Sequence, residues 1–307
     1  MKDSIVLITG ASSGLGLETA RELAAQGARI VMVCRDLTRG QAAQRQIESA
    51  ARGGASPDLY FADLSSQASV HALSRKLHTD LPRIDVLINN AGGIFDRREL
   101  TDEDMERTLA TNYLAPFLLT HLVLDLLLAA PAGRIVNIVS VLHNAGPDVL
   151  ENLHGEKSYS FMGAYKISKF ALISFTYELA RRLRETAVTV NCVEPGPTKT
   201  RFGDNMTGLP RLFPLIMKKL PLFRPVRVGA RSPVYVASSP ELQNITGTYF
   251  ENGRPARSRP ITHDRDIALR LWRLSAELTE LDIHDRLPAP RAPADRSLVT
   301  LPSAQTT

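Results

Sequence analysis

A tyrosine and a lysine four residues apart, Tyr165 and Lys169, are the residues whose types and spacing point most directly to chemistry. On an α-helix this spacing places both side chains on one face. A free tyrosine has a pKa of about 10 and is a poor base at neutral pH, but a neighbouring ammonium group stabilises the phenolate. We therefore expect Lys169 to lower the pKa of Tyr165, so that Tyr165 exchanges a proton with a substrate alcohol or carbonyl.

Ser140 fits the same chemistry, because it follows an apolar run and could polarise the same substrate oxygen through a hydrogen bond. Each of the three residues also has a structural explanation when it is taken alone. Ser140 could end a strand, Tyr165 could be a half-buried helix aromatic, and Lys169 could be a solvated charge. Their order and spacing on one scaffold favour catalysis over these separate explanations.

A glycine-rich loop lies near the N-terminus, between an apolar run at residues 5–8 and a helical pattern from about residue 17. Gly10 permits a tight turn, Gly14 lets the backbone approach a pyrophosphate, and Gly16 lets helix pack on strand. A helix that begins here would present free N–H groups to phosphates. The predicted contacts come from Gly10, Ser12, Ser13, Gly14, Leu15 and Gly16. The alternative is an ordinary glycine-rich turn with a serine cap.

The end of the second apolar run bears on the choice of dinucleotide. A site selective for NAD usually has a carboxylate there, whereas a site for NADP has an arginine that pairs with the 2′-phosphate. Cys34 ends the run and Arg35 follows, which favours NADP(H). Asp36 keeps NAD(H) open as the less favoured alternative, because a shift of two positions would place its carboxylate at the strand end.

Apolar runs alternate with helical periodicity through most of the chain. Buried strands are predicted at residues 5–8, 29–34, 58–61, 84–88, 134–139 and 188–193, with a weaker one at 248–250. Helical patterns occupy residues 17–25, 41–51, 69–77, 102–128, 164–183 and 267–281. This alternation predicts an α/β fold, a single doubly wound parallel sheet of the Rossmann type with helices on both faces.

Composition narrows the domain organisation and the classes of partner. We expect one dinucleotide-binding and catalytic domain over residues 1–285, with a C-terminal helix at 262–285 and a proline-rich, disordered tail at 286–307. Two distant cysteines and seven histidines show no metal-ligand spacing, so no metal is expected. A net charge of +5 does not call for a nucleic-acid partner. We find no signal sequence and no apolar run of about 20 residues, and therefore expect a cytoplasmic protein without a transmembrane segment.

These motifs together resemble the short-chain dehydrogenase/reductase family over residues 3–285. Besides the glycine loop, the resemblance rests on an Asp-Leu pair after the third strand, an Asn-Asn-Ala-Gly run after the fourth and a Pro-Gly pair after the sixth. It implies a catalytic tetrad in which Asn112 fixes the main chain and a water that links the lysine to solvent. That tetrad consists of Asn112, Ser140, Tyr165 and Lys169. The implied cofactor contacts are Tyr165, Lys169, Asp63, Leu64, Asn90, Ala91, Gly92, Pro195, Gly196 and Thr200.

A narrower resemblance is to the retinol-dehydrogenase-like branch, which includes WW-domain-containing oxidoreductases. It is carried by the 25-residue spacing from Ser140 to Tyr165, by the runs at 152–157 and 178–183, and by residues 248–250 followed by 271–275. We expect no hydrophobic N-terminal anchor of the kind that many members have, and a single serine replaces their paired serines. The resemblance implies an NADP(H)-dependent oxidoreductase that interconverts an alcohol and a ketone or aldehyde on a lipophilic molecule.

Residues 201–231 are predicted to form a substrate lid. The segment is basic and rich in apolar side chains, and four prolines prevent one long helix: Pro210, Pro214, Pro221 and Pro225. We expect it to become ordered over bound substrate, and such a surface could also touch an anionic membrane weakly. In relatives the two long helices pair between subunits, which implies a homodimer unless the added C-terminal helix covers that surface.

Other functions stay open at this stage. They are a catalytically silent cofactor-binding sensor or scaffold, a reductase of an activated carbon–carbon double bond, and an isomerase or sugar-nucleotide epimerase. The presence of both Tyr165 and Lys169 disfavours the sensor, and the spacing of Gly10, Gly14 and Gly16 disfavours the epimerase.

Overall fold

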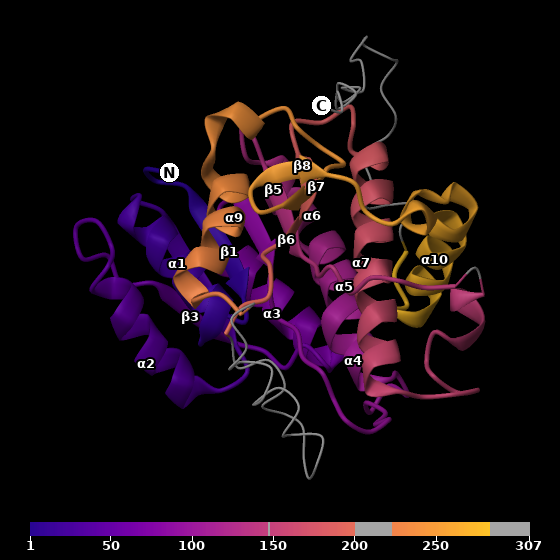
Figure 1. Ribbon diagram of the computed structural model, residues 1–307. Helices are drawn as coiled ribbons and strands as arrows, with labels where there is room; N and C mark the ends of the chain where they lie inside the picture. The colour runs from indigo at the N-terminus through magenta and orange to yellow at the C-terminus, as the bar shows by residue number, and fades with distance from the viewer. Residues whose placement is uncertain (147, 200–222, 283–307) are drawn as a thin grey trace.

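The computed structural model describes residues 1–146, 148–199 and 223–282 (Figure 1). Within these ranges one eight-stranded sheet has the order β3-β2-β1-β4-β5-β6-β7-β8. The parallel strands are β1 (Ile5–Thr9), β2 (Arg29–Cys34), β3 (Asp58–Phe61), β4 (Val86–Asn89), β5 (Arg134–Ile138), β6 (Thr189–Glu194) and β7 (Tyr249–Glu251). The predicted doubly wound parallel sheet is confirmed.

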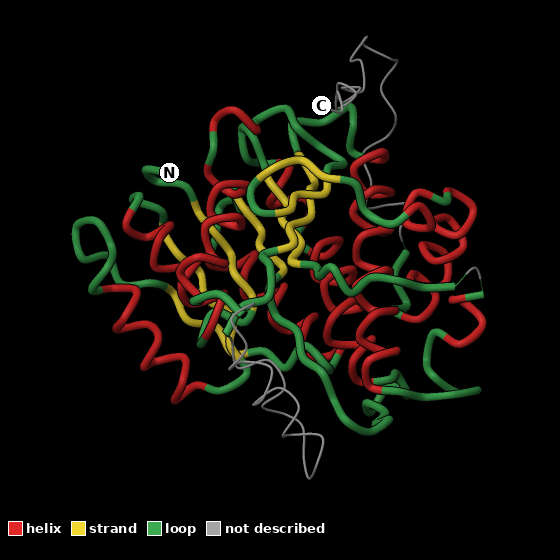
Figure 2. The backbone as a smooth tube through the Cα atoms, in the orientation of Figure 1, coloured by secondary structure: helices red, strands yellow, loops and turns green. Residues whose placement is uncertain are grey.

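The central strands are mostly apolar because both faces of the sheet are covered. In β1, Val6 and Ile8 belong to one buried cluster, while Ile5 and Leu7 belong to the other. The first cluster includes side chains of α1 (Gly14–Ala25), α2 (Leu37–Glu48) and α9 (Val226–Ser238). The second includes α3 (Gln67–Asp80), α5 (Ala115–Leu122) and α7 (Phe161–Arg182). Figure 2 shows these helices on both sides of the strands.

A further helix, α10 (Arg265–Leu278), lies outside α7. Trp272 of α10 is 2% exposed and packs against Phe117 and Phe175, with ring centroids 5.4 and 5.8 Å away. The guanidinium of Arg182 lies 4.2 Å from the centre of its ring. The predicted C-terminal helix is therefore part of the main body, and it covers the outer surface of α7.

The helical pattern at 102–128 is not one helix. The structure has α4 (Arg107–Leu109), a π-helical turn (Ala110–Leu114), α5, and then α6 (Leu124–Leu128). Pro116 contributes to the break, because it has no N–H to donate to the carbonyl of Asn112 four residues earlier. The short 3₁₀ helices of the described chain are Val149–Asn152, Pro240–Leu242 and Pro260–His263.

The sheet also has an antiparallel edge strand, β8 (Arg254–Ala256), which the sequence pattern did not predict. It follows β7 through Asn252 and Gly253, whose φ angles are 53° and 75°. Two successive positive φ angles are typical of the tight turns that join antiparallel strands, and an Asn-Gly pair adopts them readily.

Several sequence predictions fall wholly or partly outside the described residues. Thr200, most of the predicted lid at 201–231, and the predicted tail at 286–307 lie there. The described end of the lid segment leads into α9, which packs against α1. In the described part of the chain, no helix combines the length and apolar character needed to cross a bilayer.

Candidate active site

The glycine loop joins β1 to the start of α1 at the carboxyl edge of the sheet (Figure 1). Gly10 has a φ of 68°, and a Cβ on it would lie 2.9 Å from the Cα of Ala91. A Cβ on Gly16 would collide with the Asn90 side chain and the Gly10 carbonyl. Only glycine therefore allows the loop to lie against the end of β4. The first turn of α1 contains no acidic residue, and Ser13 precedes it without a side-chain cap bond, so the helix N-terminus can receive an anion.

Asn90 holds this loop in place. Its Nδ2 donates to the carbonyl oxygens of Thr9 at 2.8 Å and Gly10 at 3.3 Å. The hydroxyl of Thr9 in turn accepts from the backbone N–H groups of Asn90 and Ala91, each at 3.0 Å. The predicted Asn-Asn-Ala-Gly run is thus brought against the glycine loop, and the Asn90 side chain is used to join β1 to β4.

At the end of β2 the two candidate selectivity residues differ in what they contact. Arg35 is exposed. The Asp36 carboxylate caps α2 by accepting from the Arg39 N–H at 3.0 Å, and it pairs with the Arg39 guanidinium at 3.1 Å. Asp36 is therefore engaged with its own helix, whereas the Arg35 side chain forms no hydrogen bond or ion pair within the described residues.

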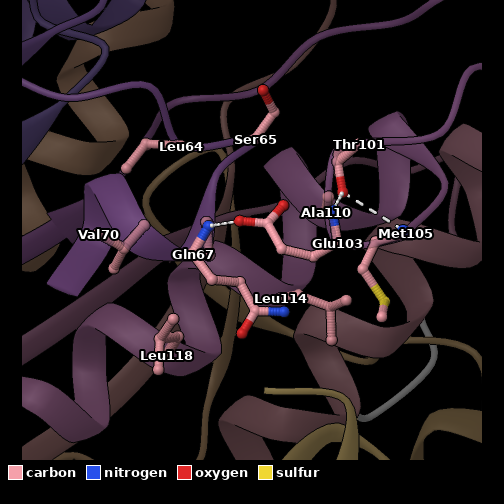
Figure 3. A pocket seen from close by; sticks show the side chains of 11 residues that line it. Leu64, Ser65, Gln67, Val70, Thr101, Glu103, Met105, Ala110, Leu114 and Leu118 are labelled. Atoms are coloured by element: carbon pink, nitrogen blue, oxygen red, sulfur yellow. Dashed lines mark hydrogen bonds between the residues drawn. The ribbon is translucent and has the colours of Figure 1, made fainter. Parts of the chain in front are cut away.

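Asp63 and Leu64 follow β3, and Leu64 lines a small pocket at the start of α3 (Figure 3). The Asp63 carboxylate accepts from both the N–H and the hydroxyl of Ser65, at 2.9 and 2.7 Å. Across the pocket, the Glu103 carboxylate accepts from the Gln67 N–H at 2.8 Å, as the dashed line in Figure 3 marks. Glu103 thereby holds the loop before α4 against the N-terminus of α3, next to Asp63 and Leu64, two of the predicted cofactor contacts.

The predicted catalytic residues come together where α7 passes the end of β5. The helix begins at Phe161 because the Ser160 hydroxyl caps it, accepting from the Gly163 N–H at 3.1 Å. The Ser140 hydroxyl lies close enough to the Tyr165 hydroxyl to lower its pKa. The Nζ of Lys169 lies 5.8 Å from the centre of the Tyr165 ring and donates to the Ile138 carbonyl at 2.9 Å.

The electrostatics of this cluster correct one prediction. Tyr165 is 8% exposed, and burial raises its pKa to about 12, with the charge of Glu194 acting in the same direction and the Ser140 hydrogen bond in the opposite one. The expectation that Lys169 brings the pKa of Tyr165 below 10 is therefore wrong for this geometry, because desolvation outweighs the favourable contacts. Burial also lowers the pKa of Lys169 to about 8.

Asn112 lies in the π-helical turn and is completely buried. Its Oδ1 accepts from the Gly93 N–H at 2.8 Å, and its Nδ2 donates to the Gly93 carbonyl at 2.9 Å and to the Ser168 hydroxyl at 3.1 Å. A Cβ on Gly92 would lie 3.2 Å from Asn112 Oδ1 and 3.6 Å from Lys169 Nζ. The side chain of Asn112 thus fixes the main chain after β4 directly beside Lys169.

Pro195 and Gly196 follow β6, and Gly196 has a φ of 78°. The Gly196 N–H donates to the Glu194 carboxylate at 2.9 Å. Glu194 is 4% exposed, and burial raises its pKa. The Val141 backbone is also close enough to this carboxylate to oppose that rise, so Glu194 lies between this turn and the loop after Ser140. Glu194 was not among the residues predicted from the sequence, although an acid that ends an apolar strand just before Pro-Gly is a visible signal.

The family described as short chain dehydrogenase matches residues 4–208. The chain is 39% identical over 290 residues to retinol dehydrogenase 14 of Mus musculus, covering 90% of this chain and 85% of that protein. It is 34% identical over 287 residues to retinol dehydrogenase 13 of Homo sapiens, with 90% and 85% covered.

Solved structures give the same relationship. A putative uncharacterized protein from Mycobacterium paratuberculosis superposes with a TM-score of 0.73 and 31% identity, covering 92% of this chain and 95% of that one. An actinorhodin polyketide ketoreductase solved with NADPH has a TM-score of 0.65 and 27% identity, covering 82% and 97%.

Proposed function

This chain belongs to the short-chain dehydrogenase family, and from that premise we propose that it is an NADP(H)-dependent oxidoreductase that interconverts an alcohol and a ketone or aldehyde on a lipophilic molecule. Membership of the family makes it an oxidoreductase of alcohol and carbonyl groups. The observation that carries the finer proposal is the juxtaposition of Ser140 and Tyr165, with Lys169 one helical turn further along α7. In this proposal Tyr165 is the general acid and base.

The chemistry follows from the two hydroxyl groups. In reduction, the substrate oxygen accepts hydrogen bonds from Ser140 and Tyr165, which polarise the carbonyl. When bound, the nicotinamide supplies a hydride in reduction and accepts one in oxidation. Tyr165 transfers its proton to the substrate oxygen as the negative charge develops there, so that one hydride and one proton convert carbonyl to alcohol. A tyrosine whose pKa is about 12 is fully protonated at neutral pH, which suits a proton donor.

Lys169 returns a proton to Tyr165 after Tyr165 has protonated the substrate oxygen. Its Nζ lies beside both Gly92 and the Tyr165 ring, and its pKa of about 8 lets it exchange protons near neutral pH. Asn112 keeps the main chain after β4 in the position that this arrangement requires.

The choice of NADP(H) rests on the end of β2. Arg35 is exposed there and can pair with a 2′-phosphate, whereas the carboxylate of Asp36 is already used by α2. The glycine loop supports the binding of a dinucleotide of either kind. Gly10 and Gly16 have no side chain, so the loop backbone can turn tightly into the start of α1, where a pyrophosphate would bind. The structure neighbour solved with NADPH agrees with this choice.

A lipophilic substrate is favoured by the apolar surroundings of the two hydroxyls. Val141 and Leu142 follow Ser140 and are 49% and 40% exposed. Phe161 and Met162 pack against Tyr165 together with buried Ile94. Retinol dehydrogenases, the relatives named above, act by name on a lipophilic alcohol.

The test is a turnover assay with the purified chain, using retinaldehyde, nonanal and benzaldehyde as carbonyl probes and NADPH or NADH as the reductant. We expect loss of reduced-nicotinamide absorbance with NADPH and an apolar aldehyde, and formation of the matching alcohol. Tyr165→Phe serves as the control for enzymatic turnover. Tight NADPH binding without reduction of any probe would instead indicate a cofactor-binding sensor.

A further inference from the structure

Residues 258–281 lie beyond the part of the chain that matches the family, yet they contact both helices that carry the predicted tetrad. Helix α10 lies beside α7 (Figure 1). The hydroxyl oxygens of Ser275 in α10 and Tyr113 in the π-helical turn are 2.6 Å apart, within hydrogen-bond distance. The hydroxyl oxygens of Ser258 and Tyr177 in α7 are also 2.6 Å apart. The segment is therefore fixed to the framework of the site at two points.

A third link runs through His143, in the loop that follows β5. Its Nδ1 lies 2.7 Å from the Ser140 carbonyl oxygen, and its Nε2 lies 3.0 Å from the backbone nitrogen of Arg259. An amide N–H can only donate, so Nε2 accepts, and Nδ1 carries the proton that it donates to Ser140. A neutral ring thus joins the carbonyl of the predicted catalytic serine to residues 258–281.

The surroundings of His143 favour the neutral ring. It is 3% exposed, and burial lowers its pKa, with the Arg259 guanidinium acting in the same direction and the Ser140 hydrogen bond opposing both. On the other side the Tyr249 ring of β7 packs against it, with centroids 5.6 Å apart. The negative charges of Glu194 and Glu251 help to raise the pKa of Tyr249. Protonation would place a second N–H against the Arg259 N–H and break the link.

The loop between Ser140 and α7 is also held to the C-terminal segment by apolar packing. Val149 forms a buried cluster with Phe170 of α7 and Ile267 of α10, and Ile261 packs against it. The packing holds the loop as a whole, whereas the hydrogen bonds of His143 act on the residue that contacts Tyr165. The two kinds of contact therefore predict different effects when each is removed.

We propose that His143 is a positioning residue that holds Ser140 against Tyr165 by linking the Ser140 carbonyl to residues 258–281. Its effect on turnover rests on the proposed function, whereas the link itself does not. Protonation of the ring releases Arg259, so the link is intact at neutral pH and is lost in acid.

The link is tested without turnover by nitrogen-15 NMR of the full chain. We expect the His143 ring to have its proton on Nδ1 and to titrate below 6.5, with the Arg259 amide shifting over the same pH range. A ring that has its proton on Nε2, or an Arg259 amide that does not follow the ring, would overturn the proposal. Resonances are assigned with His143→Asn, whose amide nitrogen takes the place of Nδ1.

Four variants test the effect on turnover of the aldehyde probes with NADPH. His143→Leu removes both ring hydrogen bonds, whereas His143→Asn keeps a donor for the Ser140 carbonyl but has no acceptor for the Arg259 N–H. Arg259→Pro removes the N–H at a residue whose φ of −58° proline accepts, whereas Arg259→Ala keeps the N–H. We expect the leucine, asparagine and proline variants, which all lack the link, to lose about tenfold or more in kcat, with little change in KM for NADPH.

Arg259→Ala is expected to stay within about threefold of the wild type, because it keeps the N–H that the proline variant lacks. Wild-type kcat should fall in acid with the pKa of the His143 ring, and this acid limb should be absent from His143→Asn. Equal kcat values for Arg259→Pro and Arg259→Ala, or a wild-type kcat in His143→Asn, would overturn the positioning role. If no probe is turned over, the proposed function fails while the NMR titration still decides whether the link exists.

Discussion

Replacing Arg35 with alanine should remove most of the preference for NADPH over NADH. Arg35 is exposed at the end of β2, and the neighbouring carboxylate of Asp36 caps α2. In the proposed complex the Arg35 guanidinium forms a charge-assisted pair with the 2′-phosphate, a group that NADH lacks. The substitution should therefore weaken NADPH binding and leave NADH binding almost unchanged.

The size of the effect follows from the exposure of Arg35. A hydrogen bond to a charged group contributes about 1.5–3 kcal/mol, and about 1.4 kcal/mol corresponds to a tenfold change in Kd. Because solvent and salt screen an exposed pair, the loss should lie toward the lower end of that range. We expect the Kd for NADPH to rise about 10- to 30-fold, and the Kd for NADH to change by less than about twofold.

Titration of nicotinamide fluorescence at fixed ionic strength gives both dissociation constants. Asp36→Asn is the matched control, since asparagine also caps a helix and only the charge is lost. If the Asp36 carboxylate held the ribose of NADH, this control would weaken NADH binding. An Arg35→Ala protein that loses NADPH and NADH affinity equally would refute the reasoning.

Three further outcomes are expected. Tyr165→Phe should abolish turnover of the aldehyde probes while the Kd for NADPH stays within about threefold, because the hydroxyl and not the ring transfers the proton; near-normal kcat would exclude the role. Turnover should decline as pH rises through about 8, where buried Lys169 loses its charge, and a rate that stays flat to higher pH would contradict the relay. Trp272→Ala should lower the unfolding free energy in denaturant by about 3–5 kcal/mol, whereas exposed Arg273→Ala should change it by less than about 0.5 kcal/mol; a small loss for Trp272 would mean that α10 contributes little.

Local signals explain why much of the fold was predictable from sequence. A few consecutive residues are enough to identify the apolar runs of the parallel strands and the glycines of the first loop. The Asn252-Gly253 pair is equally local, and the turn into β8 could have been predicted from it. What hid it was a short strand with Pro255 at its centre, since proline usually argues against a strand.

The parts of the site that sequence could not provide depend on contacts between distant residues. The pKa of Tyr165 depends on burial, to which Ile94 from another element contributes. The role of His143 depends on Arg259, which is 116 residues away. Contacts over such sequence separations leave no pattern in a short window of sequence. Residue type and spacing therefore identify Tyr165 as a catalytic candidate but do not predict its pKa.

The π-helical turn at Ala110–Leu114 determines the direction in which the side chains of α5 point relative to those that precede the turn. The Ala115 N–H donates to the Ala110 carbonyl five residues back, so the turn contains one residue more than an α-helix of the same rise. Each residue of an α-helix advances the side-chain direction by about 100°. Deleting one residue here would restore a regular helix and rotate either α5 relative to the sheet or Asn112 relative to Lys169. The surplus residue is thus what allows the apolar face of α5 and the amide of Asn112 to be correctly oriented at the same time.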